Sequence, residues 1–327
     1  MVISPMPPLF RNMDLLDRFR GCLLGLAAGD ALGMPTEGYT ALEIKEKFGL
    51  ISEMLAAPQG HFHSGLLAGQ FTDDTEETLL LAESIIEASG FSPEGFVGKL
   101  TAWGTAWTLD ERLNRGVGFV TRSAVESMIA GTDWRQSGLS IPTCGAAMRA
   151  APIGLLYHPD INVVKSYADL QSLPTHVSPA ARAGAVAVAV GVALGAAGLS
   201  RETIFRNAVS QASRLDAELA ERLLWAGTLR DLPPEDALGL IRNSPLAMET
   251  VPAAFYCFLK FEPREALTVA ASSGGDTDSI ASIAGSLFGA AFGPSWIPES
   301  WLDAIEDKER IENAARGLFR LFSSFCR

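Results

Sequence analysis

Two short acidic motifs, about 200 residues apart, place the strongest constraint on the fold of this chain. The first acidic motif is Thr72-Asp73-Asp74, and the second acidic motif is Asp276-Thr277-Asp278-Ser279. Each follows a glycine-containing turn and begins an apolar pattern of helical period. Together they offer four carboxylates and two hydroxyls that can converge on one point, which requires the two halves of the chain to meet there.

A ligand set made only of oxygen suits hard divalent cations such as Mg²⁺ or Mn²⁺ and disfavours zinc. The alternative is two ordinary helix starts, because Thr and Asp are preferred caps and acids suit the positive end of the helix dipole. Capping uses one hydroxyl or carboxylate per helix. It leaves further aspartates whose charges repel one another unless a cation neutralises them. We therefore favour a metal site over capping alone.

Composition excludes several classes of protein. A chain of 327 residues, with 48% hydrophobic and 20% charged residues, is globular and can bury a sizeable core. The net charge of −12 argues against a nucleic-acid backbone or an anionic membrane as the main partner, although a small anionic ligand can still bind locally. The four cysteines are scattered without a CxxC pair, so we expect reduced thiols in a cytoplasmic protein.

One terminal segment and one central segment bear on the domain organisation. Residues 1–12 carry three prolines and no signal-peptide pattern, so we expect a loose tail followed by a single domain over 13–327. The apolar stretch 183–199, about 17 residues, is mostly Ala, Gly and Val, which is short and weakly hydrophobic for a bilayer. It predicts a central buried helix, with no membrane partner, and we expect a monomer.

Helical patterns dominate the chain. In 15–32, Gly21, Gly25 and Gly29 recur every fourth residue, which places small residues on one helix face and predicts close packing against a neighbour. Alternating valines within 183–199 resemble a strand, but the surrounding alanines favour a helix. Further helices are expected at 75–88, 93–108, 119–130, 145–156, 201–213, 215–229, 234–241, 249–258, 264–272, 280–291 and 308–322. The charge run 306–310 reads as a solvated helix start, and no hairpin pattern appears, so we predict an all-α, single compact multi-helix globule.

Six segments, in this order, resemble the ADP-ribosylglycohydrolase family, which includes the dinitrogenase-reductase-activating glycohydrolases and the ADP-ribosyl-acceptor hydrolases. They are GCLLGLAAGDALGMPTEG (Gly21–Gly38), GQFTDDTEETLLLAES (Gly69–Ser84), CGAAMRAAPIGL (Cys144–Leu155), PTHVSP (Pro174–Pro179), ETVPAAFYCFL (Glu249–Leu259) and SGGDTDSIASIAGSLFGAAFG (Ser273–Gly293). The resemblance implies an all-α fold with a binuclear Mg²⁺ or Mn²⁺ centre in a cleft that binds ADP-ribose.

The resemblance also implies roles for individual residues. The ligands of two divalent cations would be Thr72, Asp73, Asp74, Asp276, Asp278 and Ser279, where Ser279 stands in place of the Thr of many relatives. Glu37 matches an acidic residue that serves in catalysis in some members. Asp73 and Asp74 are further candidates for the catalytic carboxylate. Without the family, Glu37 would read as an exposed loop carboxylate.

A substrate-binding turn is implied at Cys144, Gly145, Ala146 and Met148, which match the loop that holds the diphosphate and ribose in relatives. Free backbone N–H groups at a helix start can face an anion, and glycine allows close approach; the alternative is a helix start that binds nothing. Many relatives have Asn where Cys144 stands. A nucleophilic role for Cys144 is disfavoured because no basic partner lies nearby in sequence. His176 matches a histidine that lines the pocket, and its alternative is a structural histidine.

Two departures from the family concern the acceptor. Relatives that act on ADP-ribosyl-arginine carry an aspartate where this chain has Gly116, in Gly116-Val117-Gly118. Asp110 lies six residues earlier and is the one candidate to replace it. The stretch 242–246 lacks the glycine-rich loop of several relatives.

The resulting hypothesis is a metal-dependent hydrolase that cleaves the glycosidic bond between ADP-ribose and an acceptor on a protein or small molecule. One alternative is a non-catalytic ADP-ribose-binding or structural protein on the same scaffold, which Gly116 keeps open. A metal-dependent phosphoesterase is disfavoured because no Lys/Arg cluster flanks either acidic motif.

Overall fold

Nearly every apolar pattern of helical period forms a helix in the computed structural model, which describes residues 13–325. Within that range the only β structure is three isolated bridges, at Thr40–Gly274, Leu139–His176 and Thr143–Leu246. The all-α prediction is therefore confirmed. The expected tail, 1–12, lies outside the described residues.

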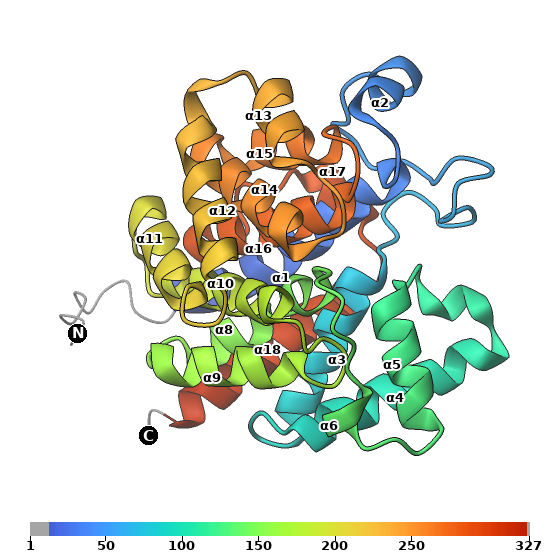
Figure 1. Ribbon diagram of the computed structural model, residues 1–327, viewed down its shortest axis with the longest axis vertical. Coiled ribbons are helices and arrows are strands. Elements are labelled where there is room, and N and C mark those ends of the chain that lie inside the picture. Colours follow the sequence, from blue (N-terminus) through green and yellow to red (C-terminus); the bar gives the residue numbers. More distant parts are fainter. Residues whose placement is uncertain (1–12, 326–327) are drawn as a thin grey trace.

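The helices pack in a single mass, with α1 and α16 crossing its centre, α12–α15 on one side and α3–α6 on the other (Figure 1). In chain order the elements are α1 (Met13–Gly33), η2 (Met34–Thr36), α2 (Ala41–Lys47), α3 (Asp73–Glu87), α4 (Pro93–Leu109), η3 (Glu111–Asn114), α5 (Phe119–Ile129), α6 (Trp134–Ser137), α7 (Gly145–Met148), α8 (Ala151–Tyr157), α9 (Ile161–Ser172), α10 (Pro179–Ala196), α11 (Arg201–Ala212), α12 (Ala217–Thr228), η4 (Leu229–Asp231), α13 (Pro234–Ile241), α14 (Ala247–Lys260), α15 (Pro263–Ala271), α16 (Thr277–Phe292), α17 (Glu299–Ala304) and α18 (Lys308–Phe325).

A seam of small residues joins α1 to α16. A Cβ added at Gly25 would lie 2.4 Å from the carbonyl oxygen of Gly285, and one added at Gly29 would lie 2.1 Å from that of Ala281. Only glycine permits backbones to approach this closely, so the predicted close packing is confirmed. Gly33, at the end of the seam, lies against Asp278, and the seam thus delivers the second acidic motif to the end of α1.

The first acidic motif reaches the same place through Asp30 of α1. The buried Asp30 carboxylate accepts hydrogen bonds from the backbone N–H groups of Thr72 (2.9 Å) and Thr75 (3.0 Å) and from the Thr75 hydroxyl (2.6 Å). These bonds fasten the start of α3 to α1. One helix therefore sets the positions of both motifs.

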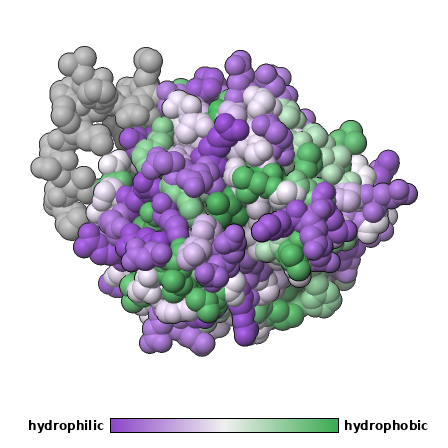
Figure 2. All heavy atoms as spheres, turned by 90° about the horizontal axis from the view of Figure 1, so that it is seen from above, coloured by the Kyte–Doolittle hydropathy of each residue, from purple (hydrophilic) through white to green (hydrophobic). Residues whose placement is uncertain are grey.

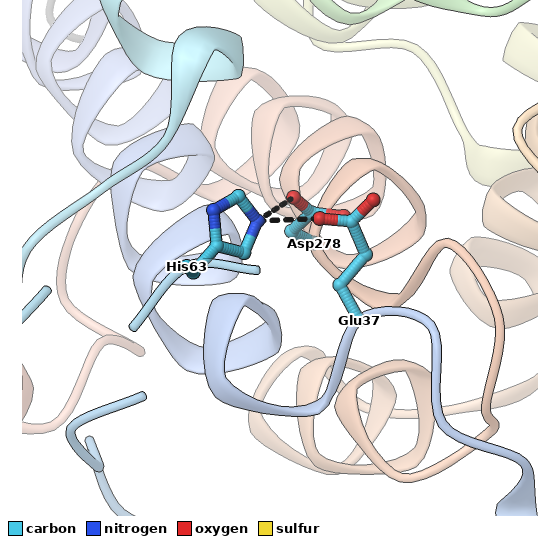
Figure 3. Close-up of side chains that lie close together, drawn as sticks. All are labelled: Glu37, His63 and Asp278. Carbon is cyan, nitrogen blue, oxygen red and sulfur yellow. Dashed lines mark hydrogen bonds and ion pairs between the residues drawn. The ribbon is translucent and has the colours of Figure 1, made fainter. Parts of the chain in front are cut away.

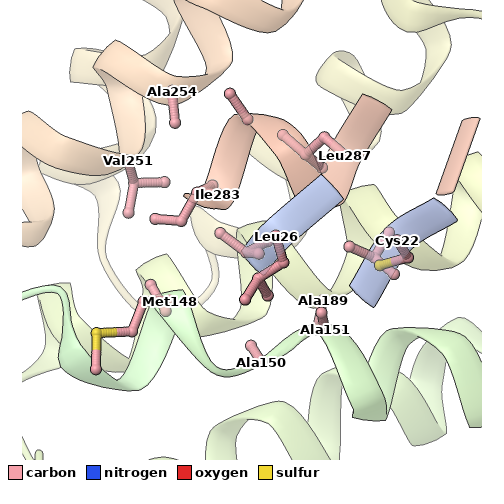
Figure 4. Close-up of a cluster of buried hydrophobic side chains, with 14 of the residues drawn as sticks. Cys22, Leu26, Met148, Ala150, Ala151, Ala189, Val251, Ala254, Ile283 and Leu287 are labelled. Atoms are coloured by element: carbon pink, nitrogen blue, oxygen red, sulfur yellow. The ribbon is translucent and has the colours of Figure 1, made fainter. Parts of the chain in front are cut away.

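The core is built around α10, which lies within the protein as predicted. Among the described helices, α10 alone is long and apolar enough to span a membrane, but 89% of it is buried inside the protein. Figure 4 shows Ala189 of α10 in one apolar cluster with Leu26 of α1 and with Ile283 and Leu287 of α16. Burial on every side identifies α10 as a core helix. On the face drawn in Figure 2, hydrophilic and hydrophobic side chains are interspersed.

Two predictions about local structure were wrong. The single helix expected at 145–156 is broken into α7 and α8, because Pro152 lacks an N–H and its ring clashes with the carbonyl four residues earlier. Helices α2, α6, α9 and α17 were missed, although Thr40 and Glu43 form a complete capping box at the start of α2.

The charge run at 306–310 is also not simply a solvated helix start. Glu306 accepts hydrogen bonds from the Phe71 N–H (3.2 Å), from Gln70 Nε2 (2.8 Å) and from the Arg115 guanidinium (2.6 Å). Its own N–H donates to the Gly69 carbonyl at 3.0 Å. Glu306 therefore anchors the loop that leads into the first acidic motif.

Candidate active site

The two acidic motifs meet at the base of a cavity of about 290 Å³. The Ser279 hydroxyl lies 3.2 Å from Asp74 Oδ1, which joins the motifs directly. Predicted residues that line the cavity are Glu37, Asp73, Asp74, Cys144, Gly145, Met148, His176, Asp276, Asp278 and Ser279. The structure thus brings most of the predicted residues together.

Two predicted residues are absent from the cavity lining. Thr72 is fully buried, and its hydroxyl accepts a hydrogen bond from the Asp74 N–H at 3.3 Å. Ala146 is also fully buried, and its carbonyl accepts from Gln171 Nε2 at 2.8 Å. Neither is among the residues that line the cavity; Ala146 supports the wall from behind, and Thr72 directly precedes the lining residue Asp73.

Capping accounts for only part of the acidic motifs. The Thr72 side chain caps α3 through Asp74, as the capping alternative requires. Asp276 precedes α16 but makes no cap; its Oδ2 accepts from the Thr250 hydroxyl (2.6 Å) and from Cys144 Sγ (3.2 Å). Helix capping therefore explains the position of Thr72 but does not explain why the carboxylates of the two motifs are buried together.

The electrostatics of the cavity base favour a cation. Burial raises the pKa of Asp74 well above its ordinary value, and the charge of Asp278 raises it further. Burial likewise raises the pKa of Asp278, with the charge of Glu37 next in importance. Asp74 Oδ2 is buried without a hydrogen-bond partner among the described residues. An unpaired carboxylate oxygen among like charges is costly, and an all-oxygen set of this kind fits a hard divalent cation.

Glu37 stands at the edge of this group, in contact with a residue that the sequence analysis missed. Its side chain is 23% exposed, so it is not the freely exposed carboxylate that the loop alone would suggest. His63 Nε2 lies 2.6 Å from Glu37 Oε2 and 4.0 Å from Asp278 Oδ2 (Figure 3). Ligand atoms of these three residues all lie within 4.8 Å of one another. Burial, followed by the charge of Asp276, raises the pKa of Glu37 well above its usual value.

The predicted substrate turn and His176 form one wall of the cavity. A Cβ added at Gly145 would lie 2.8 Å from His176 Cε1, so the turn packs directly on the imidazole. The two ring nitrogens of His176 lie 2.7 Å from the Thr175 hydroxyl and 2.9 Å from the Thr143 hydroxyl. Burial, with the charge of Arg149, lowers the pKa of His176 well below its ordinary value. His176 is therefore a neutral ring, held in one orientation.

A buried ion pair supports this wall. Arg149 pairs with Glu77, and both side chains are fully buried. Arg149 also donates to the side chain of Gln171 at 2.9 Å and to the Thr175 hydroxyl at 2.7 Å. Removal of either charged partner would leave an uncompensated buried charge, so both partners are needed. Arg149 reaches His176 through the Thr175 hydroxyl, and the ion pair therefore supports the His176 ring.

Cys144 is a buried thiol at the cavity base. Its pKa is raised well above the ordinary value by burial and then by the charges of Asp276 and Asp74. A thiolate is the nucleophilic form, so this environment argues against Cys144 as a nucleophile, in agreement with the sequence analysis.

The structure shows which residues and contacts lie at the two departures from the family. Gly116 lines the cavity with φ +83°, and a Cβ there would lie 2.2 Å from His63 Cε1. Asp110 lines a neighbouring groove, where both its carboxylate oxygens bind Arg112 (2.9 and 2.6 Å). It therefore does not supply the missing carboxylate to the cavity. From the stretch 242–246, Pro245 lines the cavity and its carbonyl accepts from the Cys144 N–H at 2.9 Å.

The chain is similar to known proteins along almost its whole length. A family model described as ADP-ribosylglycohydrolase matches residues 11–325. An uncharacterized protein of Archaeoglobus fulgidus is 39% identical over 93% of this chain and 97% of its own length. The ADP-ribosylarginine hydrolase Tri1 of Serratia proteamaculans is 31% identical over 96% of this chain and 82% of its own.

The chain is also similar to a human protein and to a solved structure. The human ADP-ribosylhydrolase ARH3 is 28% identical over 94% of this chain and 94% of its own. A solved structure titled ADP-ribosylglycohydrolase-related protein complex superposes with a TM-score of 0.77 and 28% identity, covering 94% of this chain and 99% of that one.

Proposed function

Because the chain belongs to the ADP-ribosylglycohydrolase family, we propose that it is a metal-dependent hydrolase that cleaves the glycosidic bond between ADP-ribose and an acceptor. The observation that carries the proposal is the convergence of both acidic motifs, with the unpaired Asp74 Oδ2, at the base of one cavity. The relatives named as ADP-ribosylarginine hydrolase and ADP-ribosylhydrolase support cleavage of an ADP-ribose linkage.

The residues that would hold two Mg²⁺ or Mn²⁺ ions are Thr72, Asp73, Asp74, Asp276, Asp278 and Ser279. When bound, such cations supply a water of lowered pKa and stabilise negative charge on oxygen. The carboxylates of these residues lie close together and are buried. Asp276 is held in place by hydrogen bonds from the Thr250 hydroxyl and the Cys144 thiol.

Other residues of the cavity would bind the substrate and transfer protons during hydrolysis. Gly145 and the backbone after it receive the diphosphate, and the neutral His176 ring keeps that turn in place. Burial raises the pKa of Glu37, which favours its use as the proton donor to the leaving group. Asp73 and Asp74 remain candidates for the carboxylate that receives a proton from the attacking water.

Glycine at residue 116 limits which acceptor groups we expect the protein to release from ADP-ribose. A departing guanidinium benefits from a proton donor or a paired anion, whereas an oxygen leaving group can be helped by metal or water. The cavity has no carboxylate at Gly116, and Asp110 is paired with Arg112 in the neighbouring groove. We therefore propose weak or no hydrolysis of ADP-ribosyl-arginine, and that any efficient hydrolysis is of O-linked or other acceptors.

The test is a panel of ADP-ribosyl substrates with arginine or serine as acceptor, incubated with Mg²⁺ or with a chelator. Release of free ADP-ribose that stops with the chelator supports the proposal, and Glu37→Gln should lower turnover by roughly 10²-fold while ADP-ribose still binds. Release of AMP would identify a phosphoesterase, and binding without any product would identify a non-catalytic protein. Efficient cleavage of ADP-ribosyl-arginine would overturn the assignment of the acceptor.

We also propose a cytoplasmic monomer with no membrane or nucleic-acid backbone partner. The free thiols of Cys22, Cys144 and Cys257 and the net charge of −12 support this part of the proposal.

A further inference from the structure

Two histidines of the loop before α3 hold Glu37 at two different points. His61 Nε2 lies 2.7 Å from the backbone carbonyl oxygen of Glu37, and His63 Nε2 lies 2.6 Å from its carboxyl Oε2. Both separations are those of good hydrogen bonds. Main chain and side chain of Glu37 are thus fixed by the same short loop.

The loop itself is held in one conformation. The His63 N–H donates to His61 Nδ1 at 3.2 Å, so His61 accepts at Nδ1 and carries its ring proton at Nε2, where it donates to Glu37. The His61 ring packs against Phe62, with ring centroids 4.3 Å apart, and against Tyr39, at 5.3 Å. His61 and His63 are only 8% and 4% exposed. Such burial limits the alternative positions that the two rings can take.

Gly116 provides the space that His63 occupies. A Cβ at residue 116 would lie 2.2 Å from Cε1 and 2.6 Å from Nδ1 of His63, so any other residue there would displace the ring. The ring also lines a groove of about 690 Å³ that shares Gly116 with the cavity. His63 therefore stands between the cavity and this groove and approaches Glu37 from the groove side.

We propose that His61 and His63 are positioning residues that clamp Glu37 against the second acidic motif, and that Gly116 is required for the clamp. His63 would fix the direction of the Glu37 carboxyl, and His61 would fix the backbone from which it projects. The role of the clamp in turnover rests on the proposed function, whereas the clamp itself can be observed without hydrolysis.

The catalytic test compares His63→Ala, His63→Gln and His61→Ala. Misplacement of a catalytic group by about 1 Å can lower turnover up to 10²-fold, so His63→Ala should reduce kcat by roughly 10- to 100-fold with little change in KM. His63→Gln keeps a hydrogen-bonding group and should recover part of the loss. If His63 acts through Glu37, the double variant Glu37→Gln/His63→Ala should be no slower than Glu37→Gln. Additive losses would overturn a positioning role.

The role of Gly116 is tested with Gly116→Ala and a matched control, Gly49→Ala. Both positions have positive φ, +83° and +73°, but a Cβ at Gly49 meets nothing within 4 Å. Gly49→Ala therefore reproduces the backbone strain without touching His63. Gly116→Ala should reduce kcat as His63→Ala does, while Gly49→Ala keeps wild-type turnover. Equal effects of the two substitutions would show that the ring does not need the space.

A readout independent of turnover is NMR of protein labelled with ¹⁵N-histidine, because the chain has four histidines. A protected, low-field proton signal should link His63 Nε2 to Glu37 and vanish in Glu37→Ala and in Gly116→Ala. A wild-type protein that shows this signal but hydrolyses nothing would refute the proposed function and leave the clamp standing. Absence of the signal, or its survival in Glu37→Ala, would overturn the clamp.

Discussion

The glycine seam between α1 and α16 leads to a quantitative prediction for Gly29→Ala. The new methyl group would lie 2.1 Å from the Ala281 carbonyl oxygen, so the two helices must part by about 1 Å to restore van der Waals contact. Overpacking of this kind costs about 3 kcal/mol at the upper end, because the obstacle is backbone and cannot rotate away. Alanine regains about 1 kcal/mol of helix propensity, which leaves a net destabilisation of about 2 kcal/mol.

This free energy converts into a small shift of the melting temperature. The entropy of unfolding is about 2.1 cal/mol/K per residue, or about 0.7 kcal/mol/K for 327 residues, so Tm should fall by about 3 °C. Because the seam places Asp278 against the end of α1, the substitution should also weaken the rise in Tm that we expect Mg²⁺ to cause. Scanning calorimetry with a chelator and with Mg²⁺ measures both effects.

The matched control is Gly98→Ala on the exposed face of α4. A Cβ there meets nothing within 4 Å, so only helix propensity changes and Tm should rise by about 1 °C. A Gly29→Ala protein that melts at or above the wild-type temperature, with an unchanged response to Mg²⁺, would refute the argument that the seam fixes the site.

Three further predictions concern the cavity. The double variant Asp276→Asn/Asp278→Asn should lose most of the stabilisation by Mg²⁺; a melting curve that still responds like wild type would remove these residues from the metal site. Gly145→Val should weaken ADP-ribose binding, because its side chain would collide with His176, and calorimetry should show unchanged Mg²⁺ affinity; equal ADP-ribose affinity in both proteins would contradict the assigned turn. The pKa values of Asp74 and Asp278 are raised in the folded protein, so it binds more protons than the unfolded chain between the ordinary carboxyl range and neutral pH. Metal-free protein should therefore gain stability as the pH falls from about 7 to about 5. Protein saturated with Mg²⁺ should instead lose stability over this range, because protons compete with the cation. Thermal melts in which Tm changes with pH in the same way in both conditions would refute this.

The sequence was sufficient to predict the helical fold and the meeting of the two acidic motifs. Both predictions rest on local signals, namely helical period, turn residues and an excess of aspartates beyond capping. The break at Pro152 was also readable, since proline interrupts a helix by a local steric effect. The capping box of Thr40 and Glu43 at α2 was a second local signal that went unused.

Other parts of the site depend on contacts between distant segments. Asp30 is a single aspartate in an apolar helix, and only the fold shows that it holds the start of α3. His63 lies in a loop without periodicity, and its contact with Glu37 joins residues that are 26 positions apart in the sequence. Gly116 was recognised as a departure from the family, but no nearby residue reveals that the His63 ring fills the space beside it.

The anchoring of the first acidic motif by Glu306 has a consequence for synthesis of the protein. Nascent chains fold from their N-terminal end as the ribosome releases them. The loop before α3 has no partner for its Gly69 carbonyl or Phe71 N–H until Glu306 has emerged, which is 27 residues after Ser279, the last residue of the cavity lining. A chain stopped just before Glu306 would carry all of the cavity residues without the tie that holds them, so the candidate site is completed only after its last residue has been made.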